Sequence, residues 1–511
     1  MWQPSLAGVA FFASLVAAAL LLEVLLVLLL PGRLLRGFTA LFFGIAAPIA
    51  YFSDTYGVFL GKAMLRNVFA TDAHEVSELI NGRLIAYLLL LGVAPCLVIL
   101  RLEMPMTSWR RRLGERSAFA AVVLAVCVLG GVVSSARYTS LLHEHKTVRY
   151  FLNPVVAVYN TLRLSLGSAP RLANVAIAET TTPATRIADG GTRPLVLFLV
   201  IGETARAANF QLGGYARATN PELSQIPDLV YFGDTSSCGT ATSVSLPCMF
   251  SDRGRKSFDA DVADRSTNLL DALSQAGLDV EWRDNNSGCK GVCDRVRHID
   301  LAMSGDPTVC PAAHCYDERM LIDLPGLLRD LKQDIVIVFH QIGSHGPSYA
   351  RRYPPEFERF APACQHNRLD QCSREEVRNA YDNTIVYTDH NLARQIALLE
   401  DASAYTDGLL IYVSDHGESL GENGLYLHGM PYALAPDTQT KVPFLIWMSQ
   451  PYQQRSGVTT ACLAAQASAA VSHDNLFHTV MGSVGVRSPV YDAALDLFAG
   501  CQPAKPAARP D

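Results

Sequence analysis

The sequence predicts an integral membrane protein in two parts: an α-helical transmembrane domain, followed by an α/β domain whose mostly parallel sheet has helices on both faces. Two observations lead to this prediction. Residues 1–138 contain four apolar stretches with almost no charge, and the C-terminal half contains three short apolar runs rich in β-branched residues. Long apolar stretches are typical of membrane spans, and short runs without polar alternation are typical of parallel strands buried on both faces.

The four apolar stretches are Val9–Leu30, Phe38–Phe52, Leu84–Leu100 and Ala118–Val133. Several are long enough to cross a hydrocarbon core of about 30 Å. The alternative for the first stretch is a cleaved signal peptide, but no basic residue precedes it and further spans follow. We therefore assign residues 1–138 to a transmembrane domain with four visible spans.

Basic residues predict the orientation of these spans. Arg33 and Arg36 lie between the first two stretches, and five arginines lie between the third and the fourth: Arg101, Arg110, Arg111, Arg112 and Arg116. Because arginine-rich loops stay in the cytoplasm, the loop of residues 54–82 and everything after the fourth span should face outward. A fifth span upstream of Met1 would leave this topology unchanged.

The cysteines support an outward-facing second part. Ten of the twelve lie there, and eight of these ten fall into pairs at short separations: Cys238 with Cys248, Cys289 with Cys293, Cys310 with Cys315, and Cys364 with Cys372. Cys462 and Cys501 remain for each other. An even, locally paired set is typical of an oxidising compartment, and the absence of a Cys-x-x-Cys pair disfavours a cysteine-rich zinc site. Sequence alone leaves the connectivity open.

The remaining boundaries follow from composition. Residues 139–193 form a connector, in which His143–Leu166 mixes apolar and basic residues like a membrane-surface helix, and residues 167–193 resemble a flexible linker. Helical patterns at Thr267–Ala276 and Glu375–Leu399 alternate with strands, so we expect a soluble α/β domain over residues 194–502. Residues 503–511 should be a disordered tail.

The three apolar runs each end next to side chains that bind metals. Glu203 follows Pro194–Ile201, His345 follows Asp334–Phe339, and Asp415 with His416 follows Gly408–Val413. In open α/β sheets, ligands bind beyond the carboxyl ends of the strands, so these four side chains should converge on one site. Carboxylate and imidazole groups are usual ligands of zinc, and a catalytic zinc keeps one position open. A buried, hydrogen-bonded pair is the alternative for Asp415 and His416 taken alone.

The segment Cys238–Cys248 supplies hydroxyl groups after a glycine, inside a predicted disulfide loop that opens a helix. A helix N-terminus offers free N–H groups to an anion, and a bound metal lowers the pKa of a hydroxyl. Without the metal residues, simple N-capping would explain these hydroxyl groups.

Several motifs closely resemble the lipid A phosphoethanolamine transferases, a family of the alkaline phosphatase/sulfatase superfamily that includes intrinsic and plasmid-borne colistin-resistance enzymes. The motifs are Gly202–Arg206, Cys238–Cys248, Asp284–Ser287 with Lys290, His340–Pro347, Ser414–Gly424 with His428, and Asp54–Gly57 with Thr71–Glu75 in the outward loop. The resemblance runs from about Tyr51 to at least Pro443. It implies a multi-pass protein of the bacterial inner membrane with its catalytic domain in the periplasm.

The resemblance implies a two-step reaction on an alkaline-phosphatase-like sheet. Thr242 would take phosphoethanolamine from phosphatidylethanolamine, giving a phosphothreonine and diacylglycerol, and would pass the group to a lipid A phosphate. The product would lower the negative charge of the outer membrane and confer polymyxin resistance. Glu203, Thr242, Asp415 and His416 match the positions that hold a tightly bound Zn²⁺.

Five further residues match positions that bind phosphoethanolamine or a second, weaker zinc: Thr240, Asn286, Lys290, His345 and His428. Glu75 matches a position that meets the amine of the donor, and His345 or His428 would transfer a proton, as imidazole titrates near neutral pH. Two features depart from the family. Arg374 stands where some relatives carry a histidine, which disfavours a stable second zinc, and four visible spans are one fewer than usual.

Other functions stay open on the sequence. The acceptor could be a lipopolysaccharide core sugar or a periplasmic glucan, and a phosphoglycerol transferase would use similar chemistry. A sulfatase would need a C-x-P-x-R sequence, which is absent near Cys238 and Cys248. A membrane sensor without enzymatic activity would not need intact metal-ligand and nucleophile positions. We expect a monomer, and the net charge of −6 disfavours nucleic acid as a partner.

Overall fold

The computed structural model describes residues 32–58, 61–71, 73–102, 109–133, 153, 155–168, 184–187, 191–302, 309–311 and 314–502, together with 11, 13, 14, 16 and 17. The chain forms two compact units. One comprises Met1–Leu65 and Ile80–Ser165, and the other comprises Arg66–Leu79 and Leu166–Asp511. Residues 66–79 thus group with the larger unit, although the sequence assigned the loop that contains them to the membrane domain.

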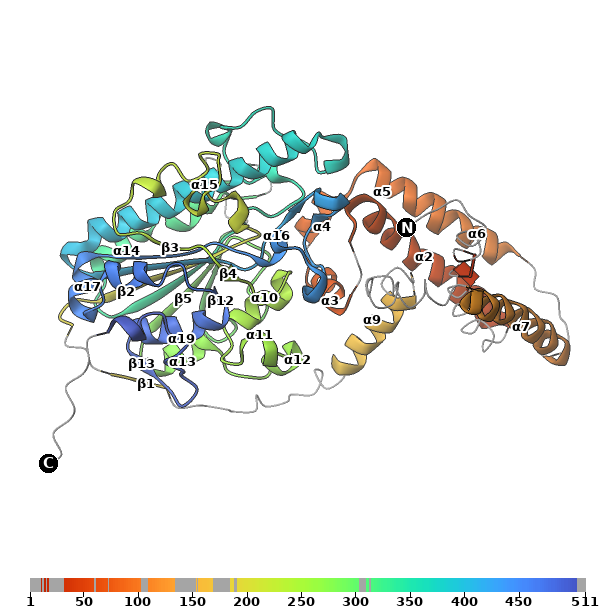
Figure 1. The fold of residues 1–511 in the computed structure, drawn as a ribbon, viewed down its shortest axis with the longest axis horizontal. Coiled ribbons are helices and arrows are strands. Elements are labelled where there is room, and N and C mark those ends of the chain that lie inside the picture. Colours follow the sequence, from red (N-terminus) through yellow and green to blue (C-terminus); the bar gives the residue numbers. More distant parts are fainter. Residues whose placement is uncertain are drawn as a thin grey trace. The chain divides into compact units, whose positions relative to one another are not determined.

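The smaller unit is helical (Figure 1). Its helices are α2 (Gly32–Tyr56), α5 (Gly82–Tyr87), the π-helical turn η1 (Leu88–Val93), α6 (Ala94–Arg101), α7 (Trp109–Val133) and α9 (Val155–Ser168), and α3 (Lys62–Ala70) crosses the boundary between the units. Three helices in the described part of the chain are long and apolar enough to cross a membrane: Leu34–Tyr56, Gly82–Arg101 and Leu113–Gly130. They contain or largely overlap the second, third and fourth predicted stretches. The first, Val9–Leu30, lies almost wholly outside the described residues.

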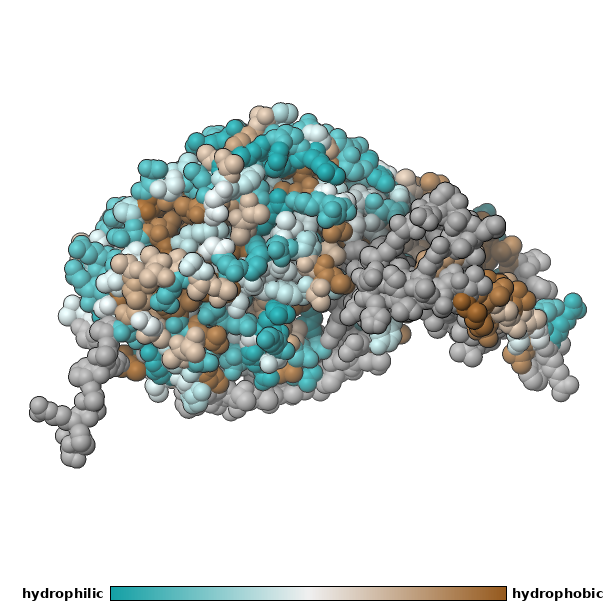
Figure 2. All heavy atoms as spheres, in the orientation of Figure 1, coloured by the Kyte–Doolittle hydropathy of each residue, from teal (hydrophilic) through white to brown (hydrophobic). Residues whose placement is uncertain are grey.

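The span Gly82–Arg101 contains the π-helical turn just before Pro95. Proline has no N–H to donate, and a π-turn shifts the hydrogen-bond pattern locally. The N–H of Ala94 accordingly donates to the carbonyl of Leu89, five residues earlier. Several apolar side chains of α7 are exposed, among them Val128 and Leu129, and hydrophobic surface is visible along this helix in Figure 2. This exposure suits contact with lipid tails.

The larger unit is built on a seven-stranded sheet in the order β3-β11-β8-β2-β7-β5-β6. The strands β8, β2, β7, β5 and β6 are parallel neighbours, and β11 runs antiparallel to β8 and β3. This confirms a mostly parallel sheet. The strands are β2 (Leu195–Gly202), β3 (Val230–Phe232), β5 (Asp279–Asp284), β6 (Arg297–Asp300), β7 (Ile335–His340), β8 (Asp407–Ser414) and β11 (Phe444–Met448).

Helices cover both faces of this sheet (Figure 1). The α-helices of the unit besides α3 are α4 (Ala73–Leu79), α10 (Thr242–Met249), α11 (Gly254–Ser257), α12 (Ala260–Ala263), α13 (Leu269–Gln275), α14 (Leu324–Asp330), α15 (Arg374–Asp401), α16 (Asp437–Thr440), α17 (Gln450–Ser456), α18 (Thr460–Ala465) and α19 (Asp474–Ser483). Alternate residues of β2, such as Leu197 and Leu199, join the core with α10, α13 and α19. The intervening residues, such as Phe198, are equally buried and point to the opposite face, on which α15 lies.

Short strand pairs complete the unit: β9 (Ser419–Leu420) with β10 (Tyr426–Leu427), and β12 (Val471–Ser472) with β4 (Thr235–Ser236). In addition, β1 (Thr185–Arg186) pairs with β13 (Val486–Arg487). β1 lies in the segment that the sequence predicted as a flexible linker, and the neighbouring stretches 169–183 and 188–190 lie outside the described residues, as does the predicted tail 503–511. The linker prediction is therefore wrong at β1, because the backbone there is held by strand pairing.

All five predicted disulfides form: Cys238–Cys248, Cys289–Cys293, Cys310–Cys315, Cys364–Cys372 and Cys462–Cys501. The two cysteines within spans, Cys96 and Cys127, are free. The pairing is local in four of the five cases, so each of these four bridges closes a short segment, whereas Cys462–Cys501 joins residues 39 positions apart.

We predict that Cys364→Ser destabilises the protein by about 2 kcal/mol, since loss of a native bridge loosens its loop and frees the unfolded chain. The control is Cys127→Ser, which breaks no bridge. Thermal unfolding of both variants, with zinc present, measures the difference. An unchanged melting temperature for Cys364→Ser would show that this bridge does not stabilise the fold.

We also predict a pH-dependent stability from Asp389 on α15. Its carboxylate accepts hydrogen bonds from the N–H groups of Glu222 and Leu223 at 2.9 and 3.1 Å, but burial raises its pKa to about 7. A raised pKa in the folded state favours folding at low pH, and this contribution is lost as the pH rises through 7. The melting temperature of the parent should therefore fall, relative to Asp389→Asn, between pH 4 and pH 7. A constant difference across this range would contradict the prediction.

Candidate metal centre

The site begins with the register of four neighbouring strands. In the order β8-β2-β7-β5, Ile201 pairs with Val413 on one side and with His340 on the other, and His340 pairs with Asp284. The carboxyl ends of these strands are therefore level. Gly343 allows the loop after β7 to pass close to β2, because a Cβ atom at this position would lie 2.8 Å from the carbonyl oxygen of Glu203. Its positive φ of 47° also favours glycine.

Three predicted ligands meet at this edge. Glu203, Asp415 and His416 are buried, and one ligand atom from each lies within 4.8 Å of the others. The Nε2 atom of His416 lies 3.4 Å from Oε1 of Glu203 and 3.3 Å from Oδ2 of Asp415. The fourth predicted strand-end residue, His345, lies farther along its loop and is not part of this trio.

The three groups fit a bound divalent cation. The Nδ1 atom of His416 must donate, because its partner at 3.0 Å is the carbonyl of Gly417. Burial lowers the pKa of His416 well below its usual range, so Nε2 carries a lone pair that faces two carboxylates. Oδ1 of Asp415 accepts from two backbone N–H groups, whereas Oδ2 is buried without a hydrogen-bond donor among the described residues. Burial raises the pKa of Asp415, and buried acceptors that face one another are stabilised by a proton or, as this ligand set allows, by a cation between them.

Thr242 lies against this trio as the first residue of α10. Its hydroxyl oxygen is 3.0 and 3.2 Å from the carboxylate oxygens of Glu203 and 3.3 Å from Nε2 of His416. The helix start presents unpaired N–H groups near this hydroxyl, which favours a negative charge there. The Cys238–Cys248 bridge joins the preceding loop to the same helix.

Asn286 holds Glu203 in place. Its amide nitrogen donates to Oε2 of Glu203 and to the carbonyl of Gln341, both at 2.9 Å, and its amide oxygen accepts from the N–H of Ser287. The predicted contact of Asn286 with substrate stays a prediction; in the structure its side chain contacts the Glu203 carboxylate and the backbone of Gln341 and Ser287. Asp284, two residues before Asn286, is also buried. Burial raises the pKa of Asp284, but His340 and three hydrogen bonds outweigh this effect and lower the pKa to about 2.

His345 and His428 lie beside the trio. The rings of His416 and His428 have centroids 4.4 Å apart, and those of His428 and His345 are 5.9 Å apart. Burial, together with the positive charge of Arg352, lowers the pKa of His345 well below its usual range, so His345 is neutral near pH 7. Nδ1 of His428 is 3.2 Å from Oε2 of Glu418, a buried residue that the sequence reasoning missed. The position of Glu418 within the Ser414–Gly424 motif was the feature of the sequence that could have identified it.

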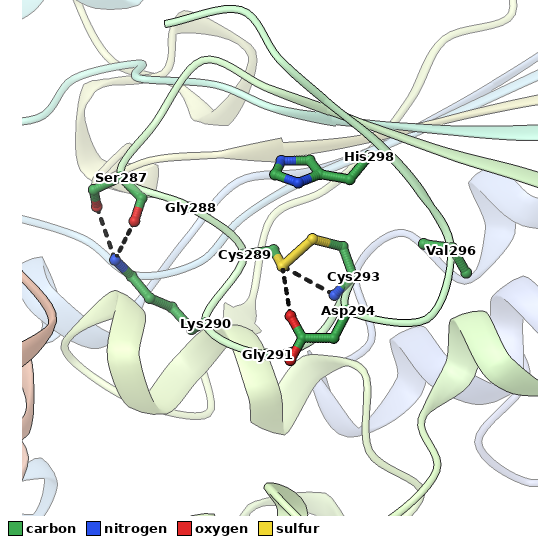
Figure 3. Close-up of a pocket in the computed structure, with 9 residues that line it drawn as sticks. All are labelled: Ser287, Gly288, Cys289, Lys290, Gly291, Cys293, Asp294, Val296 and His298. Atoms are coloured by element: carbon green, nitrogen blue, oxygen red, sulfur yellow. Dashed lines mark hydrogen bonds between the residues drawn. A yellow bond between two sulfur atoms is a disulfide. The ribbon is translucent and has the colours of Figure 1, made fainter.

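Thr240 and Lys290 lie at the margins of the site. The hydroxyl of Thr240 donates to the carbonyl of Met430 at 2.6 Å. The Lys290 ammonium donates to the carbonyl and hydroxyl oxygens of Ser287 at 2.7 and 2.9 Å (Figure 3). Figure 3 also shows the Cys289–Cys293 bridge and His298. Together with Lys290, they line a cavity of about 430 Å³. Although Cys289, Cys293 and Asp294 cluster, both sulfur atoms belong to the disulfide, so they do not form a second metal site.

The remaining predicted positions are placed as follows. Glu75 lies on α4, which belongs to the larger unit, and Arg374 is the first residue of α15. The structure reveals two further charged residues that the sequence reasoning missed, Glu78 on α4 and Arg352 in the loop after His345. They are 274 positions apart, so no local pattern could have linked them.

Two family models match the chain. The model described as phosphoethanolamine transferase EptA/EptB matches residues 17–167, and the model described as sulfatase matches residues 196–486. Phosphoethanolamine transferase EptA of Salmonella typhimurium (strain LT2) is 40% identical over 471 residues, which cover 91% of this chain and 86% of that protein. Phosphatidylethanolamine transferase Mcr-1 of Escherichia coli is 37% identical over 425 residues, covering 81% of this chain and 77% of that protein.

A solved structure is also similar over nearly the whole chain. The integral membrane protein lipooligosaccharide phosphoethanolamine transferase A (EptA) from Neisseria meningitidis has a TM-score of 0.88 and 34% identity, covering 93% of this chain and 88% of that one. With the apolar helices, this similarity confirms an inner-membrane protein with a periplasmic catalytic domain. The chain belongs to the EptA family of phosphoethanolamine transferases, within the alkaline phosphatase/sulfatase superfamily.

Proposed function

We propose that this enzyme transfers phosphoethanolamine from phosphatidylethanolamine to a phosphate of lipid A through a phosphothreonine at Thr242. The observation that carries the proposal is the position of the Thr242 hydroxyl, which lies within 3.3 Å of both Glu203 and His416. A nucleophile at a metal centre and a helix start suits attack on a phosphate ester.

Zn²⁺ is the proposed cofactor, held tightly by Glu203, Thr242, Asp415 and His416. One imidazole, two carboxylates and a hydroxyl suit this borderline ion. When bound, zinc would lower the pKa of the Thr242 hydroxyl and offset charge on the phosphoryl oxygens. A weaker second zinc would lie near His345 and His428, and Arg374 in place of a histidine disfavours it.

In the first step, Thr242 Oγ would form a bond to phosphorus while the bond from phosphorus to the diacylglycerol oxygen breaks. The hydroxyl proton of Thr242 faces the Glu203 carboxylate, which Asn286 keeps in place. In the second step, an oxygen of a lipid A phosphate would attack the same phosphorus and release Thr242. Two displacements in sequence avoid a direct encounter of two large lipids at one phosphorus.

Two histidines are the proposed groups for proton transfer. His345 is neutral near pH 7 and can accept a proton from the attacking phosphate. His428, paired with Glu418, is the second candidate and would give a proton to the leaving diacylglycerol oxygen, because a carboxylate on Nδ1 orients the ring. Thr240, Lys290 and, on α4, Glu75 remain the proposed contacts to phosphoethanolamine, with Glu75 binding its ammonium group.

Lipid A is the proposed acceptor because related enzymes are named for it or for lipooligosaccharide. Kdo(2)-lipid A phosphoethanolamine 7''-transferase of Escherichia coli is a more distant relative, 27% identical over 491 residues. Adding an ethanolamine cation to a lipid A phosphate would lower the negative charge of the outer membrane. Cationic polymyxins would bind it less well, which would give colistin resistance. We propose that the enzyme acts as a monomer.

We predict that Thr242→Ala abolishes transfer while Thr242→Ser retains part of it, because serine keeps a hydroxyl on the same carbon. The measurement is mass spectrometry of lipid A from a Gram-negative host that expresses each variant. The parent should add one phosphoethanolamine group to lipid A, and Thr242→Ala should add none. Full modification of lipid A by Thr242→Ala would contradict the proposal that Thr242 is the nucleophile. If the parent modifies only core sugars or glucans, lipid A is not the acceptor.

We predict that Asn286→Ala weakens zinc binding by roughly 10- to 100-fold, as expected when a group that orients a ligand is lost. Asn285→Ala is the matched control, because the Asn285 amide donates to the Cys315 carbonyl and to Asp317 instead of Glu203. Competition with a fluorescent chelator gives both affinities, and chelator treatment of the parent should abolish transfer until zinc is restored. Equal affinities in the parent and Asn286→Ala would contradict the orienting role.

A further inference from the structure

We infer that Arg352 is a positioning residue that couples α4 to His345 through a buried ion pair with Glu78. The inference rests on the proposed function, since it gives a role to the helix that carries the proposed amine-binding residue Glu75. It adds two residues, Glu78 and Arg352, to those that determine how the donor lipid is held.

The ion pair is buried on both sides. The side chains of Glu78 and Arg352 are each 3% exposed, and both guanidinium Nη atoms face the carboxylate, Nη1 at 3.3 Å from Oε1 and Nη2 against Oε2. A two-pronged pair of this kind fixes orientation as well as distance. Burying two charges is unfavourable unless hydrogen bonds satisfy both groups. The guanidinium of Arg352 and the carboxylate of Glu78 meet this condition through their two-pronged contact.

The third prong of the guanidinium contacts the site loop. Nε of Arg352 donates to the backbone carbonyl of His345 at 2.8 Å. The guanidinium of Arg352 thus contacts Glu78 on α4 through its two Nη atoms and the loop of His345 through its Nε atom. Lysine has a single ammonium group and cannot reproduce these fixed directions.

Other contacts hold α4 and its surroundings to the same unit. The amide of Asn367, within the Cys364–Cys372 loop, donates to the backbone carbonyl of Glu78. Arg66, which precedes α4, forms an ion pair with Asp261 on α12. These contacts agree with the grouping of residues 66–79 with the larger unit.

The consequence concerns the donor lipid. Glu75 lies one turn before Glu78 on α4, so a shift of α4 moves the proposed amine site relative to Thr242 and His345. A displacement of about 1 Å is enough to lower a rate by about 100-fold. Arg352 therefore keeps the two ends of the headgroup, amine and phosphorus, at a fixed separation.

The neighbouring residue Arg351 provides a matched control. Its Nη1 atom is 3.7 Å from the same carboxylate, but its side chain is 61% exposed. If net positive charge near Glu78 were sufficient, loss of Arg351 and of Arg352 would have similar effects.

The test uses the full-length, zinc-loaded protein in detergent micelles that contain a fluorescent phosphatidylethanolamine. The variants are Arg352→Lys, Glu78→Gln, their combination, and Arg351→Lys. We expect Arg352→Lys and Glu78→Gln each to raise KM for the donor by about tenfold at parental zinc content. The double variant should have a KM no higher than that of the more impaired single variant, because both substitutions break the same ion pair. Arg351→Lys should match the parent.

Several results would overturn the inference. Parental kcat and KM in Arg352→Lys and Glu78→Gln would do so, as would additive effects in the combination. A lower melting temperature with unchanged KM per zinc-loaded molecule would show that the pair only stabilises the fold. Failure of the parent itself to transfer phosphoethanolamine would contradict the proposed function instead, so the two failures are distinguishable.

Discussion

The convergence of buried acceptors at one edge of the sheet is the constraint on which the rest of the site depends. Glu203, Asp415 and His416 bring two carboxylates and a lone pair together in a region that solvent does not reach. Without a cation or a proton, such an arrangement is unfavourable, because no hydrogen-bond donor reaches Oδ2 of Asp415 among the described residues. The position of Thr242, the hydrogen bond from Asn286 to Glu203, and the buried imidazole rings nearby are all consistent with a metal at this point.

The sheet makes this convergence possible at low structural cost. Parallel strands with level ends bring residues that are more than 200 positions apart to one line, and each ligand follows its strand by only one or two residues. The short distance from a rigid strand limits how far a ligand can move. Two disulfides, Cys289–Cys293 and Cys364–Cys372, constrain the loops that contain Lys290 and Asn367.

Much of this arrangement could be predicted from the sequence. Buried parallel strands are visible as apolar runs, and the residues that follow them, Glu203, Asp415 and His416, do meet in the structure. Cysteine pairing was predictable because most partners are close in sequence. The ion pair between Glu78 and Arg352 was not predictable, because it joins a loop between membrane spans to the catalytic domain and leaves no periodic pattern. Strand β1 was missed for a related reason, since two residues that pair with a distant strand look like linker.

The most direct test of the account is anomalous X-ray diffraction at the zinc absorption edge, from crystals of the full-length protein grown with zinc. The account predicts one strong peak within bonding distance of Glu203, Asp415, His416 and the Thr242 hydroxyl. A peak elsewhere, or none at this edge of the sheet in zinc-loaded protein, would contradict it.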